Sequence, residues 1–139
     1  MKAPIILERT VKAPVDKVWK ALTDPKDMKQ WYFDLEGFKP EVGFKFEFDA
    51  GEEGKKFRHV CEVTEAIVNH KLAYTWRYAG YEGESLVTFE LFPEGDNTRI
   101  KLTHEGLETF PPLPDFSKQN FETGWRSIIG TQLKEFVEK

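Results

Sequence analysis

The 139-residue sequence contains a single cysteine, Cys61, and no long apolar run. One thiol excludes an intramolecular disulfide and any zinc site built from several thiolates. No segment approaches the roughly 18 consecutive apolar residues of a membrane helix. The three-residue apolar run near the N-terminus is also much shorter than the roughly 7–15 residues in a signal peptide. We therefore expect no membrane insertion and a cytoplasmic location.

The sequence also lacks a strong excess of one charge. Twenty Lys and Arg face twenty-four Asp and Glu, which gives a net charge of -4 with both signs scattered along the chain. Without a basic stripe, nucleic acid is not an expected partner. Internal repeats, low-complexity segments and linkers are absent as well. A chain of this length then predicts one domain that covers residues 1–139.

Aromatic residues, in contrast, are abundant, with 12 Phe, 4 Tyr and 4 Trp. From Gly43 onward they alternate with charged residues, as in Phe44, Phe46 and Phe48. A period of two predicts half-buried strands, and it recurs at 57–64, 72–78, 85–91 and 100–104, with another short strand at 5–11. Because only short turns separate most of these runs, we expect an antiparallel sheet.

Two short helices are predicted directly after the first strand. Apolar residues recur there at i, i+3, i+4 and i+7, namely Val15, Val18, Trp19 and Leu22. Pro14 stands where the first turn of a helix accepts proline, since its missing N–H would have no partner there. Asp24 and Pro25 then have the residue types of an N-cap and a first helical position, which predicts the second helix.

The longest helix is predicted over residues 117–139. With a step of about 100° per residue, six apolar side chains fall on one side: Phe121, Trp125, Ile128, Ile129, Leu133 and Phe136. Gln132 falls inside this apolar face, where an amide without a partner costs several kcal/mol. Two interpretations stay open, a Gln132 that bonds a neighbour or lies at the edge of the face, and a Gln132 that is a polar anchor in a cavity. Gly124 and Gly130 each cost a helix interior roughly 1 kcal/mol, so close packing or space for a ligand must compensate.

Four local motifs together resemble a known family. They are VKAPVDKVWKALTDP at 11–25 followed by Trp31, LAYTW at 72–76, LTHEG at 102–106, and Gly124-Trp125 at the last helix. The sequence is similar to the C-terminal domain of the heat shock protein 90 ATPase activator, in the START-like (Bet v 1-like, SRPBCC) superfamily. The resemblance implies an α+β helix-grip fold, in which a curved antiparallel sheet of about six strands surrounds a long C-terminal helix, with two short helices after the first strand.

The resemblance further implies a cavity between the last helix and the sheet that holds a small hydrophobic molecule such as a lipid, sterol, polyketide or phenolic compound. We expect its walls to be formed by eight residues: Trp125, Gln132, Ile128, Ile129, Trp76, Tyr74, His59 and His104. An apolar, proline-containing loop precedes the last helix and offers a possible lid: Leu107, Phe110, Leu113 and Phe116. The same side chains could instead cap the open end of the core. The stretch 33–38 could form the opposite rim.

The sequence supports a catalytic or metal site less well than a ligand cavity. His59 and Cys61 lie two residues apart on one strand, but two ligands do not make a metal site, so we expect no metal and no cofactor. Several side chains could move a proton, but they form no recognisable constellation and none is assigned as catalytic: His59, His104, Tyr74, Tyr78, Arg58 and Arg126. We therefore prefer a monomeric domain that binds a small hydrophobic molecule. The alternatives are a module that contacts a chaperone, as the resemblance suggests, and a cyclase or hydrolase that uses the same cavity.

Overall fold

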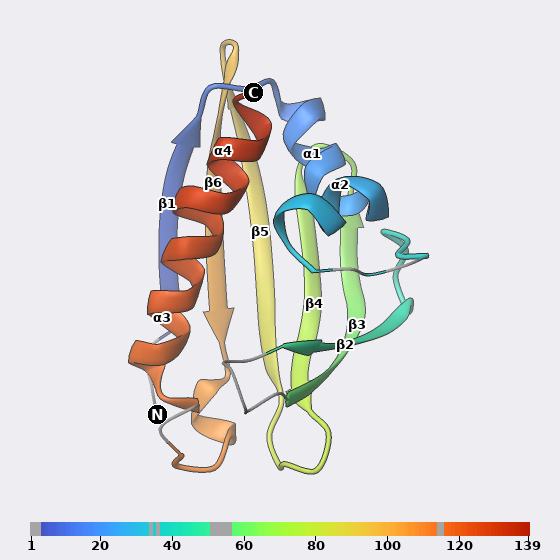
Figure 1. The fold of residues 1–139 in the computed structure, drawn as a ribbon, viewed down its shortest axis with the longest axis vertical. Helices are drawn as coiled ribbons and strands as arrows, with labels where there is room; N and C mark the ends of the chain where they lie inside the picture. The colour runs from blue at the N-terminus through green and yellow to red at the C-terminus, as the bar shows by residue number, and fades with distance from the viewer. Residues whose placement is uncertain (1–3, 34, 36, 51–56, 114–115) are drawn as a thin grey trace.

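The computed structural model describes residues 4–33, 35, 37–50, 57–113 and 116–139. Six strands and two short helices form the first three quarters of the chain: β1 (Ile5–Val11), α1 (Val15–Thr23), α2 (Pro25–Trp31), β2 (Lys45–Ala50), β3 (Phe57–Ile67), β4 (Lys71–Tyr78), β5 (Ser85–Glu94) and β6 (Asn97–Glu105). A short 3-10 turn η1 (Leu107–Thr109) leads to the terminal helix, which consists of α3 (Lys118–Ser127), the π-helical segment η3 (Ile128–Leu133) and α4 (Lys134–Val137). Figure 1 shows α1, α2 and the terminal helix on the same face of the sheet.

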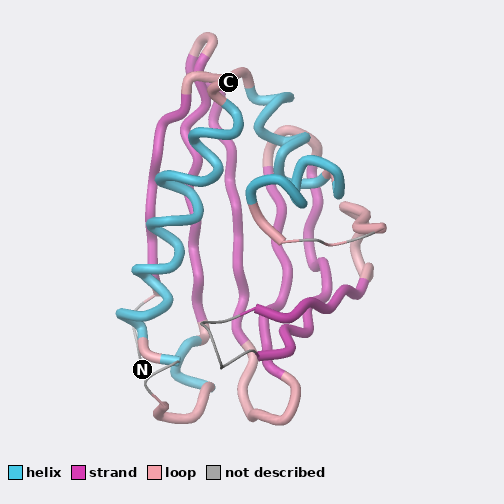
Figure 2. Tube along the Cα trace, in the orientation of Figure 1, coloured by secondary structure: helices cyan, strands magenta, loops and turns pink. Residues whose placement is uncertain are grey.

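The strands form one antiparallel sheet in the order β1-β6-β5-β4-β3-β2. Strands β2 to β6 pair with their sequence neighbours, and β1 pairs with β6, so that Ile5 lies opposite His104. The pairing of β3 with β4 shifts register between Val63 and Glu65, and such a bulge bends and twists a strand. Figure 2 shows that the part of the sheet containing β2 is turned steeply relative to β1, β5 and β6. The expected curved antiparallel sheet and helix-grip architecture are confirmed.

The core lies between the concave face of this sheet and the helices. Alternate strand residues are buried there, as in β6, where every second residue from Thr98 to His104 is inaccessible. A large share of the aromatic residues belongs to this single core: Trp19, Trp31, Phe46, Phe48, Tyr74, Trp76, Tyr78, Phe89, Phe121 and Trp125. Large rings fill the wide gap between a curved sheet and one helix. The packing of the core therefore explains a large share of the aromatic residues in the sequence.

The two short helices begin as the sequence predicts. Pro14 precedes α1 with extended backbone, and the carboxylate of Asp24 accepts a hydrogen bond of 2.9 Å from the N–H of Lys26 at the start of α2. The indole N–H of Trp31 donates to the carbonyl of Ala21 at 2.8 Å, which joins α2 to α1. These contacts fix the side of the core that faces the second half of the terminal helix.

The terminal helix departs from a uniform α-helix. Its buried residues follow a strict spacing of four: Phe121, Trp125, Ile129, Leu133 and Val137. In an α-helix, four steps of about 100° overshoot a full turn by about 40°, so such a stripe would wind away from the sheet. A π segment takes more residues per turn because its hydrogen bonds join i to i+5. The segment Ile128–Leu133 therefore corrects the drift and keeps the stripe on the core.

This segment corrects the prediction for Gln132. A constant 100° step places Gln132 inside the apolar face, whereas in the structure Gln132 is exposed. Leu133 and Val137 are buried, and Phe136 is only partly buried. The amide nitrogen of Gln132 donates to the carbonyl of Trp31 at 2.8 Å. Gln132 thus has a partner at the edge of the helix face, which is one of the two interpretations left open by the sequence.

Candidate functional site

A cavity of about 400 Å³ lies between the first half of the terminal helix and strands β3 and β4. Seven of the thirteen described residues that line it are Phe, Tyr or Trp. These thirteen are Phe33, Ala50, Phe57, His59, Trp76, Tyr78, Phe116, Asn120, Phe121, Thr123, Gly124, Trp125 and Ile128. This volume falls in the range of small-molecule sites, which are mostly apolar with a few placed polar groups.

Strands β3 and β4 supply the sheet wall of the cavity. His59 and Tyr78 are cross-strand partners, and Trp76, two residues before Tyr78, lies on the same face of β4. The His59 ring stacks on Phe48 of β2 with centroids 4.5 Å apart and planes 13° apart. The ring centroids of His59 and Trp76 lie 4.8 Å apart with an interplanar angle of 89°, which is an edge-to-face contact. The imidazole is therefore held between rings from two neighbouring strands.

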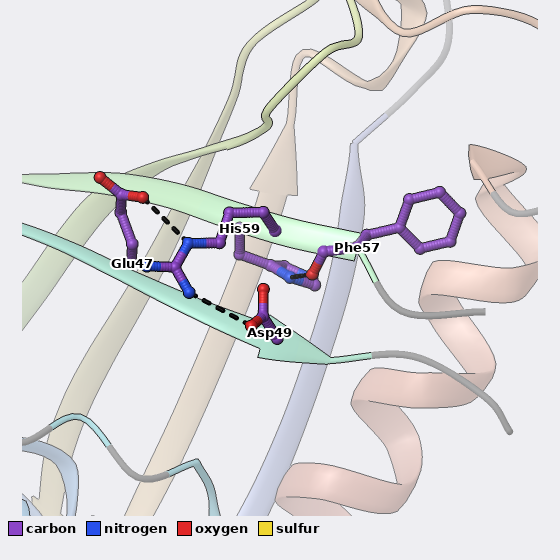
Figure 3. Close-up of polar contacts among 5 residues, drawn as sticks. Glu47, Asp49, Phe57 and His59 are labelled. Carbon is purple, nitrogen blue, oxygen red and sulfur yellow. Dashed lines mark hydrogen bonds and ion pairs between the residues drawn. The ribbon is translucent and has the colours of Figure 1, made fainter. Parts of the chain in front are cut away.

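The protonation of His59 follows from its contacts. Its Nδ1 lies 2.9 Å from the carbonyl of Phe57, as Figure 3 shows. Burial lowers the pKa of His59 to about 4, although the carbonyls of Phe57 and Phe48 partly oppose this shift. The imidazole is therefore neutral at pH 7. Because a carbonyl can only accept, the proton is on Nδ1, and Nε2 carries a lone pair.

Arg58 lies between two cavity residues in sequence but faces the other side of the sheet. Its guanidinium donates to the carboxylates of Glu47 at 3.0 Å and Asp49 at 3.2 Å, both on β2. These two carboxylates are labelled in Figure 3. Successive strand residues point to opposite faces, which separates Arg58 from His59. Arg58 is thus removed from the candidates for chemistry in the cavity.

The terminal helix supplies the opposite wall. Trp125 contacts Trp76 across the cavity region, with ring centroids 5.4 Å apart. A Cβ added at Gly124 would meet no atom within 4 Å, and this exposed residue lines the cavity. The glycine leaves space there at some cost in helix stability. Space for a ligand is one of the two compensations that the sequence left open.

Trp125 is held by a buried network behind the wall. Its indole N–H donates to Nδ1 of His104 at 2.9 Å, and Nε2 of His104 lies 2.7 Å from the Ser85 hydroxyl. Ser85 in turn donates to the carbonyl of Trp76 at 2.8 Å. His104 therefore carries its proton on Nε2, and both of its nitrogens are used. Burial lowers the pKa of His104 to about 3.

The structure brings together four of the eight residues predicted for the cavity wall. Trp125, Ile128, Trp76 and His59 line the cavity. Four others do not, namely Gln132, Ile129, Tyr74 and His104. Gln132 is displaced by the π segment, Ile129 is fully buried in the core, and His104 lies behind Trp125. The Tyr74 hydroxyl is paired with that of Tyr32 at 2.9 Å.

The predicted lid residues mostly close the end of the core. Leu107, Phe110 and Phe116 are buried, and only Leu113 is well exposed, at 41%. Phe116 lines the cavity, whereas the other three do not. Pro114 and Asp115 lie outside the described residues. This placement agrees with the alternative in which these side chains cap the core, and movement of the loop stays a prediction.

Sequence reasoning missed most of the remaining wall. Phe57 shares the strand face of His59, so the same alternation could have identified it. Tyr78 and Gly124 stood out in the sequence for other reasons, as a proton-moving candidate and an odd helical glycine. Phe33 was included only in a possible rim, the stretch 33–38, in which residues 34 and 36 lie outside the described residues. Phe121 was placed on the apolar face of the last helix but not in the cavity wall. The remaining residues have no sequence signal, because their position depends on how the helix packs on the sheet: Ala50, Asn120 and Thr123.

Two further findings bear on the chemistry. Within the described residues, no three His, Cys, Asp or Glu side chains are grouped so that they could hold a metal ion. Cys61 is buried, and burial raises the pKa of its thiol well above the usual value, which makes it a poor nucleophile.

Within the described residues, no helix combines the length and apolar character needed to cross a bilayer.

Comparisons with known proteins agree with this fold. The model of a family described as "Activator of Hsp90 ATPase homolog 1-like protein" matches residues 12–138. Protein MLL2253 from Mesorhizobium loti is 28% identical, with a TM-score of 0.76 and 96% of each chain covered. Protein CV1439 from Chromobacterium violaceum is 25% identical, with a TM-score of 0.82 over 100% of this chain and 99% of that one.

A third solved structure is more distant in sequence. The Aha1 dimer from Colwellia psychrerythraea is 24% identical, with a TM-score of 0.73, and the match covers 99% of this chain and 97% of that one. At this identity the likeness shows the fold alone. No curated protein shows significant similarity to the sequence.

Proposed function

The chain belongs to the family of activator of Hsp90 ATPase homolog 1-like proteins, and from this premise we propose that it binds a small hydrophobic molecule in the cavity between the terminal helix and β3–β4. The observation that carries the proposal is the aromatic cavity of about 400 Å³. A hollow of this volume, apolar over most of its described wall and with a few polar groups, has the character of a small-molecule site.

Hydrogen bonds that fix the aromatic side chains of the cavity wall support the proposal. Trp125 is oriented by its bond to His104, and Trp76 is bonded through its indole N–H to the Tyr78 hydroxyl at 2.9 Å. Side chains held in this way do not collapse into the cavity when it is empty. A preformed site loses less conformational entropy when a ligand enters. The occupant favoured by these walls is apolar over most of its surface.

The chaperone alternative has less support. The family description refers to an ATPase activator, and a surface for another protein would need a contiguous exposed apolar patch. Among the described residues, the large exposed apolar side chains, apart from the neighbours Ile67 and Val68, belong to separate strands and loops: Ile6, Val42, Ile67, Val68, Tyr81 and Leu113. The most concentrated apolar feature is the cavity, and we therefore place small-molecule binding first.

An NMR titration with a panel of lipids, sterols, flavonoids and aromatic polyketides tests the proposal. Ligands should shift the indole signals of Trp125 and Trp76 and the backbone amide of Gly124. The side-chain amide of Gln132 is an internal reference, because it lies outside the cavity and should not shift. Shifts confined to Gln132 and exposed charged residues would contradict cavity binding.

A pair of leucine substitutions gives the matched control. Gly124→Leu places a side chain into the open space at the cavity wall, and it should weaken the binding of a ligand from the panel at least tenfold. Thr131→Leu lies on the exposed side of the same helix and should leave the affinity within twofold of wild type. Equal affinities of the two variants would show that the ligand binds elsewhere.

A further inference from the structure

His59 lines an apolar cavity, and none of the described residues donates a hydrogen bond to its Nε2. We propose that the cavity takes an uncharged aromatic ligand with a hydroxyl or N–H group, and that this group donates a hydrogen bond to Nε2 of His59. The inference rests on the proposed function and adds the chemistry of the ligand to it. Three observations carry it, namely the tautomer of His59, the fixed position of its ring, and the absence of charge in the described lining.

The tautomer makes Nε2 an acceptor. The Phe57 carbonyl receives the proton of Nδ1 at 2.9 Å, and the Phe48 carbonyl, which also interacts with the ring, can likewise only accept. A neutral imidazole has one N–H, so Nε2 must accept. Within the described part of the chain, no residue donates a hydrogen bond to Nε2. A buried acceptor that loses water without gaining a donor is destabilised.

The ring cannot turn Nε2 away from this position easily. Phe48 covers one face of the imidazole. The centroid of the Tyr78 ring lies 4.8 Å from that of the imidazole, with 65° between the two ring planes. Only 6% of His59 is exposed, although it lines the cavity. A molecule that displaces solvent from the cavity must therefore replace the hydrogen bond that water gives to Nε2.

The rest of the lining selects an uncharged ring. None of the thirteen described lining residues is Lys, Arg, Asp or Glu, so none of them would pair with a buried carboxylate or ammonium. Ring edges and faces form most of the wall, among them Trp76, Phe57 and Phe116. Aromatic rings pack on one another in stacked or edge-to-face geometry. These properties fit phenols, naphthols and indoles better than fatty acids.

Isothermal titration with two matched probes at pH 7 tests the inference. 2-Naphthol has the hydroxyl donor, and 2-methoxynaphthalene has nearly the same ring and size without it. Because the methoxy compound leaves Nε2 buried and unpaired, we expect 2-naphthol to bind about tenfold more tightly. 2-Naphthoic acid, which is charged at this pH, should bind more weakly than either.

Two variants assign the preference to His59. His59→Phe keeps an aromatic ring on Phe48 but removes the acceptor, and the tenfold preference should fall to about one. His59→Gln keeps an acceptor and should retain part of the preference. Near-ultraviolet circular dichroism verifies that both variants are folded. In the wild type, the 15N resonance of Nε2 provides a readout of the tautomer that does not depend on affinity, and it should shift when 2-naphthol is added.

The outcomes separate this inference from the proposed function. Equal binding of the two naphthalene probes to wild type, or a preference that persists in His59→Phe, would overturn the inference but leave cavity binding intact. A 15N spectrum that places the proton of free His59 on Nε2 would also overturn it. Failure of these aromatic probes together with the full lipid and sterol panel would overturn both.

Discussion

His104 is a histidine whose two nitrogens are both used by neighbours in the core. Trp125 donates to Nδ1, so a proton added at Nδ1 would face an N–H group instead of an acceptor. The residue is fully buried, and its pKa is lowered to about 3 by burial. Its role is to orient Trp125 toward the cavity while it remains neutral. The residue is therefore a source of acid sensitivity as well as a positioning contact.

The pKa of His104 predicts how stability changes with pH. Because the pKa in the folded protein lies below the ordinary value of 6.5, the unfolded chain binds a proton first as the pH falls. The stabilisation is present above about pH 6.5 and is lost progressively toward pH 3. Between pH 6.5 and 4.5 this residue should lower the free energy of unfolding by roughly 2–3 kcal/mol. Urea unfolding measured across this range tests the prediction.

Glutamine variants isolate the contribution of His104 in this experiment. His104→Gln can still accept from Trp125 and donate to Ser85 but does not titrate, so its stability should fall less between these pH values. His59 and the carboxylates contribute equally in both proteins and cancel in the comparison. His70→Gln changes an exposed histidine and should follow the wild-type pH dependence. Parallel curves for wild type and His104→Gln would refute the prediction.

At the scale of elements, the β4–β5 loop and η1 are locked together at the closed end of the core. The N–H of Glu84 donates to the Thr109 hydroxyl at 2.9 Å. A Cβ on Gly83 would lie 2.5 Å from the Thr109 carbonyl oxygen, and its φ of +103° disfavours any side chain. Only glycine allows this close approach. The loop that positions Phe110 and Phe116 therefore depends on Gly83.

Two glycine variants in the same loop test this dependence. Gly83→Ala must accept both a strained backbone and a clash with backbone atoms, and we expect a loss of about 2–4 kcal/mol in the free energy of unfolding. Gly80→Ala shares a positive φ of +83° but meets no atom within 4 Å. It should lose only about 1 kcal/mol. Similar losses in chemical denaturation would mean that the contact with Thr109 does not matter.

At the scale of the whole molecule, the cavity joins parts of the chain that are far apart in sequence. Its wall includes Ala50 at the end of β2, His59 in β3 and Trp125 in the terminal helix. In Figure 1 the terminal helix lies along β1 and β6, in the layer in front of the sheet. A ligand at this junction contacts both layers of the fold, and it can bind tightly only when both are assembled. Binding should therefore stabilise the folded protein globally.

Thermal unfolding in the presence of ligand measures this linkage. A ligand that binds only the folded state, present at about 100 times its Kd, adds roughly 2.7 kcal/mol to the free energy of unfolding. The melting temperature should rise with the logarithm of ligand concentration in wild type and in Thr131→Leu. It should change little in Gly124→Leu. A similar rise in Gly124→Leu would place the stabilising site outside the cavity.

The order of strands and helices could be predicted from local sequence. Alternation of residues such as Phe44, Phe46 and Phe48 reports which face of a strand is buried, since strand side chains have a period of two. Pro14 and the Asp24-Pro25 pair predict where the two short helices begin, because capping depends on neighbouring residues. Periodicity assigns His59, Trp76, Ile128 and Trp125 to the core, and the family resemblance implied that a cavity lies among such residues.

The sequence by itself thus determined the elements, the buried faces of the strands and the family, all of which depend on residues close together in the chain. Only the tertiary structure decided which buried side chains meet the cavity. The π segment moves Gln132 to the surface, and bonds to Trp125 and Ser85 place His104 behind the wall. These outcomes depend on helix register and on contacts between strands distant in sequence. A constant helical period contains neither kind of information.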